Sequence, residues 1–433
     1  MKNRVVKFWV EPLIITTKRK CKWGHFERNE DRATLSSKLQ TQFPDAQTYH
    51  APSLPQASNR LLSLDLLRGL TIAFMILVNN AGDFSSAYWP LLHSAWNGCT
   101  PTDIVFPTFL FIIGITTVIS TSSRLSRGTP KRTLFLQIVR RTVILFLLGI
   151  LVNSFPFFNL HAMRFFGILP RISVCYFVVA TLYLVSQGWR DKLTLFIAIL
   201  IGYWMLLRFV PVPGYGVPTH GVPFMDPLHN LAFWVDRSLF SASHLSDGTH
   251  DITGLGSTLP SIATTLLGVL TAQWLRTSHS FTKKVRSIAL AGIAAILLGG
   301  LWNFTFPINK ELWTSSFVLF AGGISMLLLA LFMWIFDRAP APQSGQKRSP
   351  LATSLLVFGT NAITAYVFSE LLASGLSSIP THPGVNLQET LYRSILHAVP
   401  NAPFASLLYS LAYVGVCWLF TYGLYRRGVF IKI

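Results

Sequence analysis

The chain has 433 residues, of which 51% are hydrophobic and only 12% are charged, and its 36 Lys and Arg exceed its 17 Asp and Glu. This composition is too apolar for a protein that is mainly exposed to water, and it favours a protein embedded in the lipid bilayer. A net charge of +19 would also suit nucleic acid, so the placement of the charges must decide between the two.

The first 59 residues are polar and basic and show no sustained hydrophobic period. We predict that residues 1–59 form a disordered cytoplasmic tail and that residues 60–433 form one multi-span membrane domain. The apolar run at residues 5–17 is interrupted by Lys7, Glu11 and Pro12, so we do not expect a cleavable signal peptide.

Ten segments approach the roughly 20 apolar residues that a membrane-spanning helix needs. The sequence therefore predicts an all-α integral membrane protein of about ten transmembrane helices. The segments are residues 61–80, 101–120, 133–152, 165–185, 193–210, 259–275, 287–306, 312–336, 351–372 and 404–425.

The basic residues follow the charge rule for membrane topology. If the N-terminus is cytoplasmic, 29 of the 36 Lys and Arg precede the first span or lie in the inner segments, and six lie on the outer side. We therefore predict cytoplasmic N- and C-termini and expect no nucleic-acid partner. A bacterial inner (plasma) membrane is the expected location, because the sequence contains no organelle signal.

Charged residues inside spans are costly and are therefore candidates for function. Asp65 and Arg68 stand three residues apart in LLSLDLLRGL, on one face of the first predicted helix. They either form a structural pair or place Arg68 near the phosphates of a cytosolic donor.

Polar residues gather where the first two predicted spans meet on the outer side. Asn79, His93, Asn97 and Asp103 belong to this connection or to the helix ends beside it. Asp103 also fits a capping residue in TPTD, and His93, between Trp residues, also fits an interfacial residue. The spacing leaves both alternatives open.

Further polar groups could line the same outer cavity. Arg171 lies about two turns inside the fourth span and needs either a partner or a route to the surface. Asn309, Lys310, Asn361 and Glu370 are additional candidates from later segments.

The sequence does not predict a metal site. The four Cys residues are scattered without a CxxC pair, and the His and Asp residues of the long outer loop show no metal-ligand spacing.

Two blocks, RLLSLDLLRGLTIAFMILVNNAGD and HSAWNGCTPTDIVFPTFLFIIGI, are the most specific part of the sequence. They resemble the heparan-alpha-glucosaminide N-acetyltransferase family and its bacterial relatives. The resemblance continues through RFFGILPRISVCYF, GLGSTLPSIATTLLGV, FPINKELWTSSFVL and LLVFGTNAITAYVFSELL, and so covers Arg60 to the C-terminus.

This resemblance implies a membrane acyltransferase that moves an acetyl group from cytosolic acetyl-CoA to the amine of an amino sugar or glycan on the far side. It implies that His93 is catalytic, with Asn79 stabilising the reacting carbonyl and Asp103 orienting the imidazole. His93 would act either as a base or as a nucleophile that forms an acetyl-enzyme. The residues expected to bind substrate are Trp96, Asn97, Arg171, Asn309, Lys310 and Asn361.

Acetyl-CoA is the expected donor, and its phosphates suggest Arg68, Arg140 and Arg141 as ligands. The alternative role for Arg140 and Arg141 is membrane topology. The chain departs from the DPEG motif of many relatives, since it has Asp251, Ile252, Thr253 and Gly254 there. That departure leaves the identity of the acceptor open.

Two rival functions remain at this level. LDxLRG also resembles transmembrane O-acyltransferases of surface polysaccharide, although the His that those proteins place at the end of the first span is absent here. A non-enzymatic transporter of a glycan or lipid is the other rival. The sequence is also compatible with a homodimer.

Overall fold

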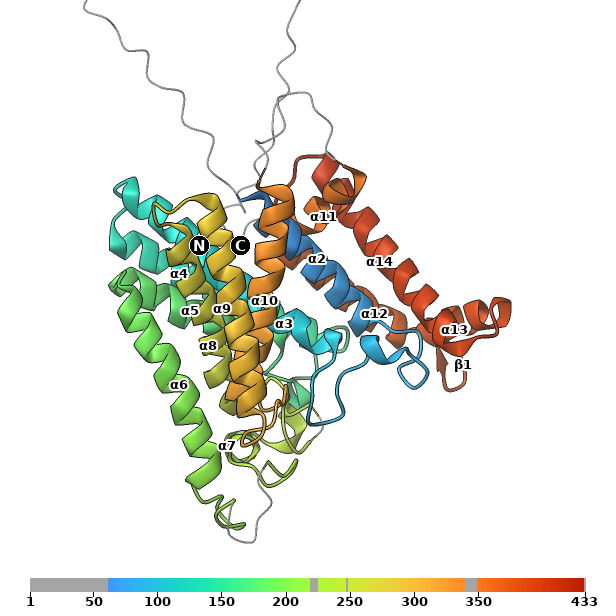
Figure 1. Ribbon diagram of the computed structural model, residues 1–433. Helices are drawn as coiled ribbons and strands as arrows, with labels where there is room; N and C mark the ends of the chain where they lie inside the picture. Colours follow the sequence, from blue (N-terminus) through green and yellow to red (C-terminus); the bar gives the residue numbers. More distant parts are fainter. Residues whose placement is uncertain (1–60, 219–224, 247, 339–348, 432–433) are drawn as a thin grey trace, which may run out of the picture.

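The computed structural model describes residues 61–218, 225–246, 248–338 and 349–431. The tail predicted for residues 1–59 lies outside them. The described chain is almost entirely helical, as Figure 1 shows, with one small hairpin of β1 (Pro380–His382) and β2 (Val385–Asn386).

Nine helices in the described residues are long and apolar enough to cross a membrane. The number of spans is ten if α11 (Pro350–Thr360) and α12 (Ala362–Ser378), which meet at an angle of 79°, are counted together as one broken span. The prediction of an all-α membrane protein with about ten spans is therefore confirmed. The nine helices are α2 (Leu62–Asn79), α3 (Pro101–Ser126), α4 (Lys131–Ser154), α5 (Ile168–Val185), α6 (Trp189–Phe209), α8 (Leu255–Leu275), α9 (Phe281–Trp302), α10 (Ser315–Phe336) and α14 (Ala402–Arg426).

Two shorter helices lie in the connections, α7 (Leu231–Leu239) and α13 (Leu387–Ala398). In Figure 1 the red helices α12, α13 and α14 form one flank of the bundle, and the green α6 lies on the opposite flank. We call the end where α2 begins the Arg68 end, and the end where α2 stops and α3 starts the His93 end. Helix α7 and the longer loops lie at the His93 end.

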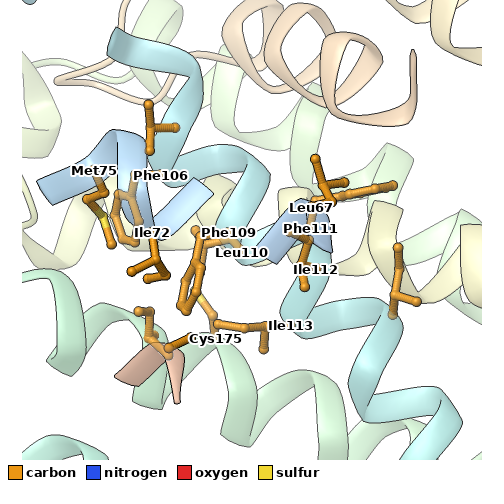
Figure 2. Packing of buried hydrophobic residues seen from close by; sticks show 14 of the residues in the cluster. Leu67, Ile72, Met75, Phe106, Phe109, Leu110, Phe111, Ile112, Ile113 and Cys175 are labelled. Carbon is orange, nitrogen blue, oxygen red and sulfur yellow. The ribbon is translucent and has the colours of Figure 1, made fainter. Parts of the chain in front are cut away.

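Helix α3 forms the centre of the bundle, because its apolar side chains pack against α2, α5, α8 and α10. Figure 2 shows Phe106, Phe109 and Leu110 of α3 packed with Ile72 of α2 and Cys175 of α5. Of its most hydrophobic stretch, 83% is buried, against 22% for α4, so α4 is left to face lipid. Helix α3 is therefore held by packing on several sides, and this packing positions the residues at its start.

Helices α2 and α11 approach so closely that only glycine fits between them. A Cβ atom on Gly69 would lie 1.9 Å from the carbonyl oxygen of Leu355, and one on Gly359 would lie 2.0 Å from that of Asp65. Small residues allow such contacts between membrane helices. The approach brings the guanidinium of Arg68 to the end of α11, where Nη1 donates to the Gly359 carbonyl at 3.2 Å.

Candidate active site

The start of α3 is fixed by a capping box. Thr100 caps the helix, and Oδ2 of Asp103 accepts the backbone N–H groups of Thr100 at 2.9 Å and of Ser94 at 3.1 Å. This reciprocal pairing satisfies N–H groups that a helix start leaves free. The capping role suggested by TPTD is thus present, and it uses only one of the two carboxylate oxygens.

The other oxygen of Asp103 holds His93. Its Oδ1 lies 2.7 Å from Nδ1 of His93, whose side chain is half exposed while that of Asp103 is fully buried. An ionised carboxylate can only accept a hydrogen bond, so this contact favours the tautomer with the proton on Nδ1 and the lone pair on Nε2. Asp103 thus both caps α3 and contacts the ring of His93.

Lys310 completes this cluster from the connection between α9 and α10. Its Nζ lies 3.4 Å from Oδ1 of Asp103, 2.8 Å from Nδ1 of His93 and 3.1 Å from Nε2. Burial lowers the pKa of Lys310, although Asp103 acts in the opposite direction. Asp103, His93 and Lys310 therefore form one cluster of three ionisable side chains.

The loop that carries His93 pairs with the loop that carries Lys310. The amide of Asn309 donates to the carbonyl of Trp96 at 3.1 Å and to Oδ1 of Asn97 at 3.3 Å. The N–H of Gly98 donates to the carbonyl of Ile308 at 2.7 Å. Trp96, Asn97 and Asn309, which we predicted to bind substrate, therefore brace the loop that carries His93.

A polar cavity of about 240 Å³ opens beside His93. Five of the residues suggested by the sequence line it, namely Asn79, His93, Arg171, Lys310 and Glu370. The other polar or charged residues along its wall are Thr102, Asn153, Arg164, Thr253 and Tyr366.

Arg171 enters this cavity wall from α5 and is buried, with 2% of its surface exposed. Its Nη2 donates to the carbonyls of Ile252 and Gly254, and the guanidinium lies 5.1 Å from the ring centre of Trp313. Arg171 thus does not extend to the surface. Its Nε and Nη1 have no hydrogen-bond partner among the described residues.

The sequence did not single out a second arginine in the wall, Arg164. It forms a two-pronged pair with Asp251, with Nε at 2.6 Å and Nη2 at 2.7 Å from the two carboxylate oxygens. Asp251 is fully buried and also accepts the backbone N–H of Thr253. Residues 251–254, which differ from the DPEG motif, therefore anchor the cavity wall through Asp251. The only sign of this role in the sequence is that Asp251 keeps the first residue of the motif.

The segment before α8 is held from a further direction by α7. Oδ1 of Asp236 accepts the backbone N–H of Leu255 at 2.8 Å, while its Oδ2 is buried without a hydrogen-bond partner among the described residues. Burial raises the pKa of Asp236 to about 6, because these hydrogen bonds offset only part of the cost of desolvation.

On the other side of the cavity, α2 meets α12. The amide of Asn79 donates to Oε1 of Glu370 at 3.5 Å, and Tyr366 is a further hydrogen-bonding neighbour of this carboxyl group. All three residues line the cavity with His93. The end of α2 and the middle of α12, joined by residues 291 positions apart in sequence, thus form one wall.

Several predicted residues lie elsewhere. Asn361 sits at the break between α11 and α12, where its side chain bonds the backbone of Val429 and Ile431. It therefore anchors the end of the described chain and does not line the cavity. Arg68 pairs with Asp65 at 3.3 Å, as their spacing predicts.

The remaining two predicted donor ligands lie on α4. Arg140 is exposed, and the guanidinium of Arg141 lies 4.6 Å from the ring centre of Tyr176 on α5. Within the residues that the structure describes, no three His, Cys, Asp or Glu side chains form a group that could hold a metal.

These features define a multi-span helical membrane protein with a histidine–aspartate pair at the edge of a polar cavity. The sequence matches the family described as heparan-alpha-glucosaminide N-acetyltransferase, catalytic, over residues 60–300, and the chain belongs to that family.

Two curated relatives carry the same name. The chain is 29% identical over 381 residues to heparan-alpha-glucosaminide N-acetyltransferase of Mus musculus and 28% identical over 377 residues to that of Homo sapiens. These regions cover 76% and 75% of this chain but 56% and 54% of the relatives. The chain thus spans about half the length of the curated relatives it matches.

Proposed function

We propose that the protein is a membrane acyltransferase that moves an acetyl group from acetyl-CoA to the amine of an amino sugar or glycan. The observation that carries this proposal is the pair of His93 and Asp103 at 2.7 Å, beside a polar cavity within a helical bundle of this family. The names of the two relatives support an amine acceptor.

The geometry around His93 suits proton transfer. Asp103 holds the proton on Nδ1, so Nε2 can take a proton from the amine as the amine attacks the thioester carbonyl. The imidazolium then gives this proton to the departing thiolate. In the covalent variant, Nε2 first bonds the acetyl carbon as the C–S bond breaks and the thiolate leaves. The amine then forms the C–N bond as the bond from Nε2 to the acetyl carbon breaks, and the proton lost by the amine neutralises the thiolate.

Other residues of the cavity would assist. The amide of Asn79 is a hydrogen-bond donor for the carbonyl oxygen as that oxygen gains charge. Arg171 lines the cavity and is proposed to contact the acceptor there. Lys310 would balance the charge of the Asp103 carboxylate, which it contacts at 3.4 Å.

The size of the cavity bears on where the donor lies. A volume of about 240 Å³ is smaller than typical pockets for drug-sized ligands, so it suits a sugar ring with the acetyl end of the donor. The rest of acetyl-CoA would then lie toward the Arg68 end. Arg68, Arg140 and Arg141 are proposed to bind its phosphates there.

The proposed orientation places the Arg68 end in the cytosol and the His93 end outside. Its support is the excess of Lys and Arg in the segments at the Arg68 end, which would make the termini cytoplasmic. Acetyl would then cross the bacterial inner membrane from donor to acceptor.

The test uses purified protein in proteoliposomes with labelled acetyl-CoA and glucosamine. We expect acetylglucosamine from the wild type and from His397→Ala, a variant of an exposed histidine on α13, and a loss of at least about 100-fold in His93→Ala. Wild-type rates in His93→Ala would refute the assignment. Transfer only to hydroxyl acceptors would favour an O-acyltransferase, and uptake of glycan without acetyl-CoA would favour a transporter.

The two routes differ in their first step. Intact-protein mass spectrometry of rapidly quenched samples containing donor alone should show an added acetyl group if the route is covalent, and this group should be absent in His93→Ala. Absence of the group in the wild type would favour direct transfer.

A further inference from the structure

The proton balance of the proposed reaction calls for a second base. A sugar amine is largely protonated near neutral pH, and an ammonium nitrogen must lose two protons before it is an amide nitrogen. The departing thiolate takes up only one of them. His93 can accept one proton and return it to the thiolate, so the other proton needs an acceptor of its own.

The cavity wall contains one carboxylate that could take it. Glu370 is the only Asp or Glu among the described residues that line the cavity. Asp103 lies behind His93, and its oxygens are occupied by the helix start, the imidazole and Lys310. Asp251 is likewise occupied, by Arg164.

The surroundings of Glu370 leave room for a cationic ligand. It lies on α12, and its hydrogen-bonding neighbours are the amide of Asn79 and the hydroxyl of Tyr366. No Lys, Arg or His among the described residues forms an ion pair with it. A half-buried carboxylate without a counter-ion gains most when a cation binds beside it, because the cation offsets its lost hydration.

We propose that Glu370 binds the ammonium group of the acceptor and takes its first proton. This assignment rests on the proposed function and deepens it, since it defines the acceptor as a cationic primary amine. The Glu370 carboxylate removes one proton and leaves a neutral amine. The amine then forms the C–N bond, His93 takes the second proton, and the C–S bond breaks as that proton passes to the thiolate.

The same balance separates amine acceptors from hydroxyl acceptors. A hydroxyl group loses a single proton, which His93 can pass to the thiolate, so a hydroxyl acceptor does not need Glu370. Each amine acetylated leaves one net proton on Glu370, which must be released before the next cycle. Glu370 is thus a determinant of specificity as well as a catalytic residue.

The test compares Glu370→Gln with Glu370→Asp, which keeps the carboxylate. The matched control is Glu389→Gln on α13, because Glu389 is paired with Arg393 and does not line the cavity. Three quantities are measured for each variant. These are stabilisation by acetyl-CoA in a thermal-shift assay, acetylation of glucosamine across pH, and acetylation at pH 7 of an aromatic amine that is unprotonated there.

We expect Glu370→Gln to bind donor normally and to acetylate glucosamine at pH 7 at least about 100-fold more slowly than the wild type. Its rate should recover as the pH rises and deprotonates the acceptor, and its rate with the aromatic amine should stay near that of the wild type. Glu370→Asp should keep more of the rate with glucosamine than Glu370→Gln, and Glu389→Gln should match the wild type.

Two results would overturn the assignment. One is a Glu370→Gln variant with the wild-type rate and pH profile for glucosamine. The other is a loss that neither alkaline pH nor the aromatic amine restores, because that would reveal a merely structural role. If the wild type itself transferred no acetyl group, the proposed function would fail and this assignment with it.

Discussion

Replacing Asp103 by Asn tests the centre of the site with almost no change of shape. The carboxylate accepts His93 on one oxygen and two backbone N–H groups on the other, with Lys310 at 3.4 Å. An Asn side chain has only one oxygen, so its NH₂ group must face either the helix start or the imidazole and the ammonium. At least one set of buried donors then loses its acceptor.

The expected cost follows from these contacts. Hydrogen bonds to charged groups contribute about 1.5 to 3 kcal/mol each, so we expect a stability loss of roughly 2 to 4 kcal/mol in Asp103→Asn. Without the carboxylate, His93 is free to adopt the other tautomer, and loss of an orienting carboxylate in comparable triads lowers kcat by up to about 10⁴-fold. We therefore expect a 10²- to 10⁴-fold fall in acetyl transfer.

The assay measures transfer to glucosamine in proteoliposomes, with donor binding and thermal unfolding followed in parallel. Asp83→Asn is the matched control, because Asp83 belongs to the same connection but caps a surface turn through Ser85 and Ser86. Donor binding should persist in both variants. A rate for Asp103→Asn within about threefold of the wild type would show that this carboxylate only caps α3.

The remaining predictions concern charge and packing. Lys310 lies 3.4 Å from the buried carboxylate of Asp103, so Lys310→Met, which removes this positive charge, should lower the unfolding temperature more than Lys310→Arg, which keeps it; equal effects would contradict the ion pair. Asp236 has a raised pKa of about 6, so its contribution to stability is full below about pH 4 and is lost as the pH rises through 6. In thermal unfolding, Asp236→Asn should therefore be more stable than the wild type at pH 7, by up to about 3 kcal/mol, and equal to it near pH 4; equal stability at both pH values would contradict this. Gly69→Ala should lower the unfolding temperature markedly, because its Cβ would lie 1.9 Å from the Leu355 carbonyl oxygen. Gly375→Ala is the control and should not lower it, because no atom lies within 4 Å of the Cβ position of Gly375. Equal effects of the two substitutions would refute the close packing of α2 and α11.

The sequence alone was sufficient to predict the features that depend on contacts between residues close together in the chain. A run of about 20 apolar residues must form a helix in lipid, since only a helix satisfies its own backbone groups there. The spacing of Asp65 and Arg68 predicted their pairing, and TPTD predicted the capping box that holds Asp103. Each of these interactions forms within about one helical turn.

The sequence suggested Lys310 and Glu370 as candidates for the cavity, but it could not predict which side chains they contact, because helix packing decides those contacts. Lys310 reaches His93 across 217 residues, and Asn79 reaches Glu370 across 291. The same packing places Asn361 outside the cavity, where its side chain bonds the backbone near the end of the described chain. The sequence by itself therefore determined the helices, their caps and the residue types available for chemistry. Only the tertiary structure decided which polar side chains share the cavity, because those contacts depend on how close the helices come and not on the spacing along any one of them.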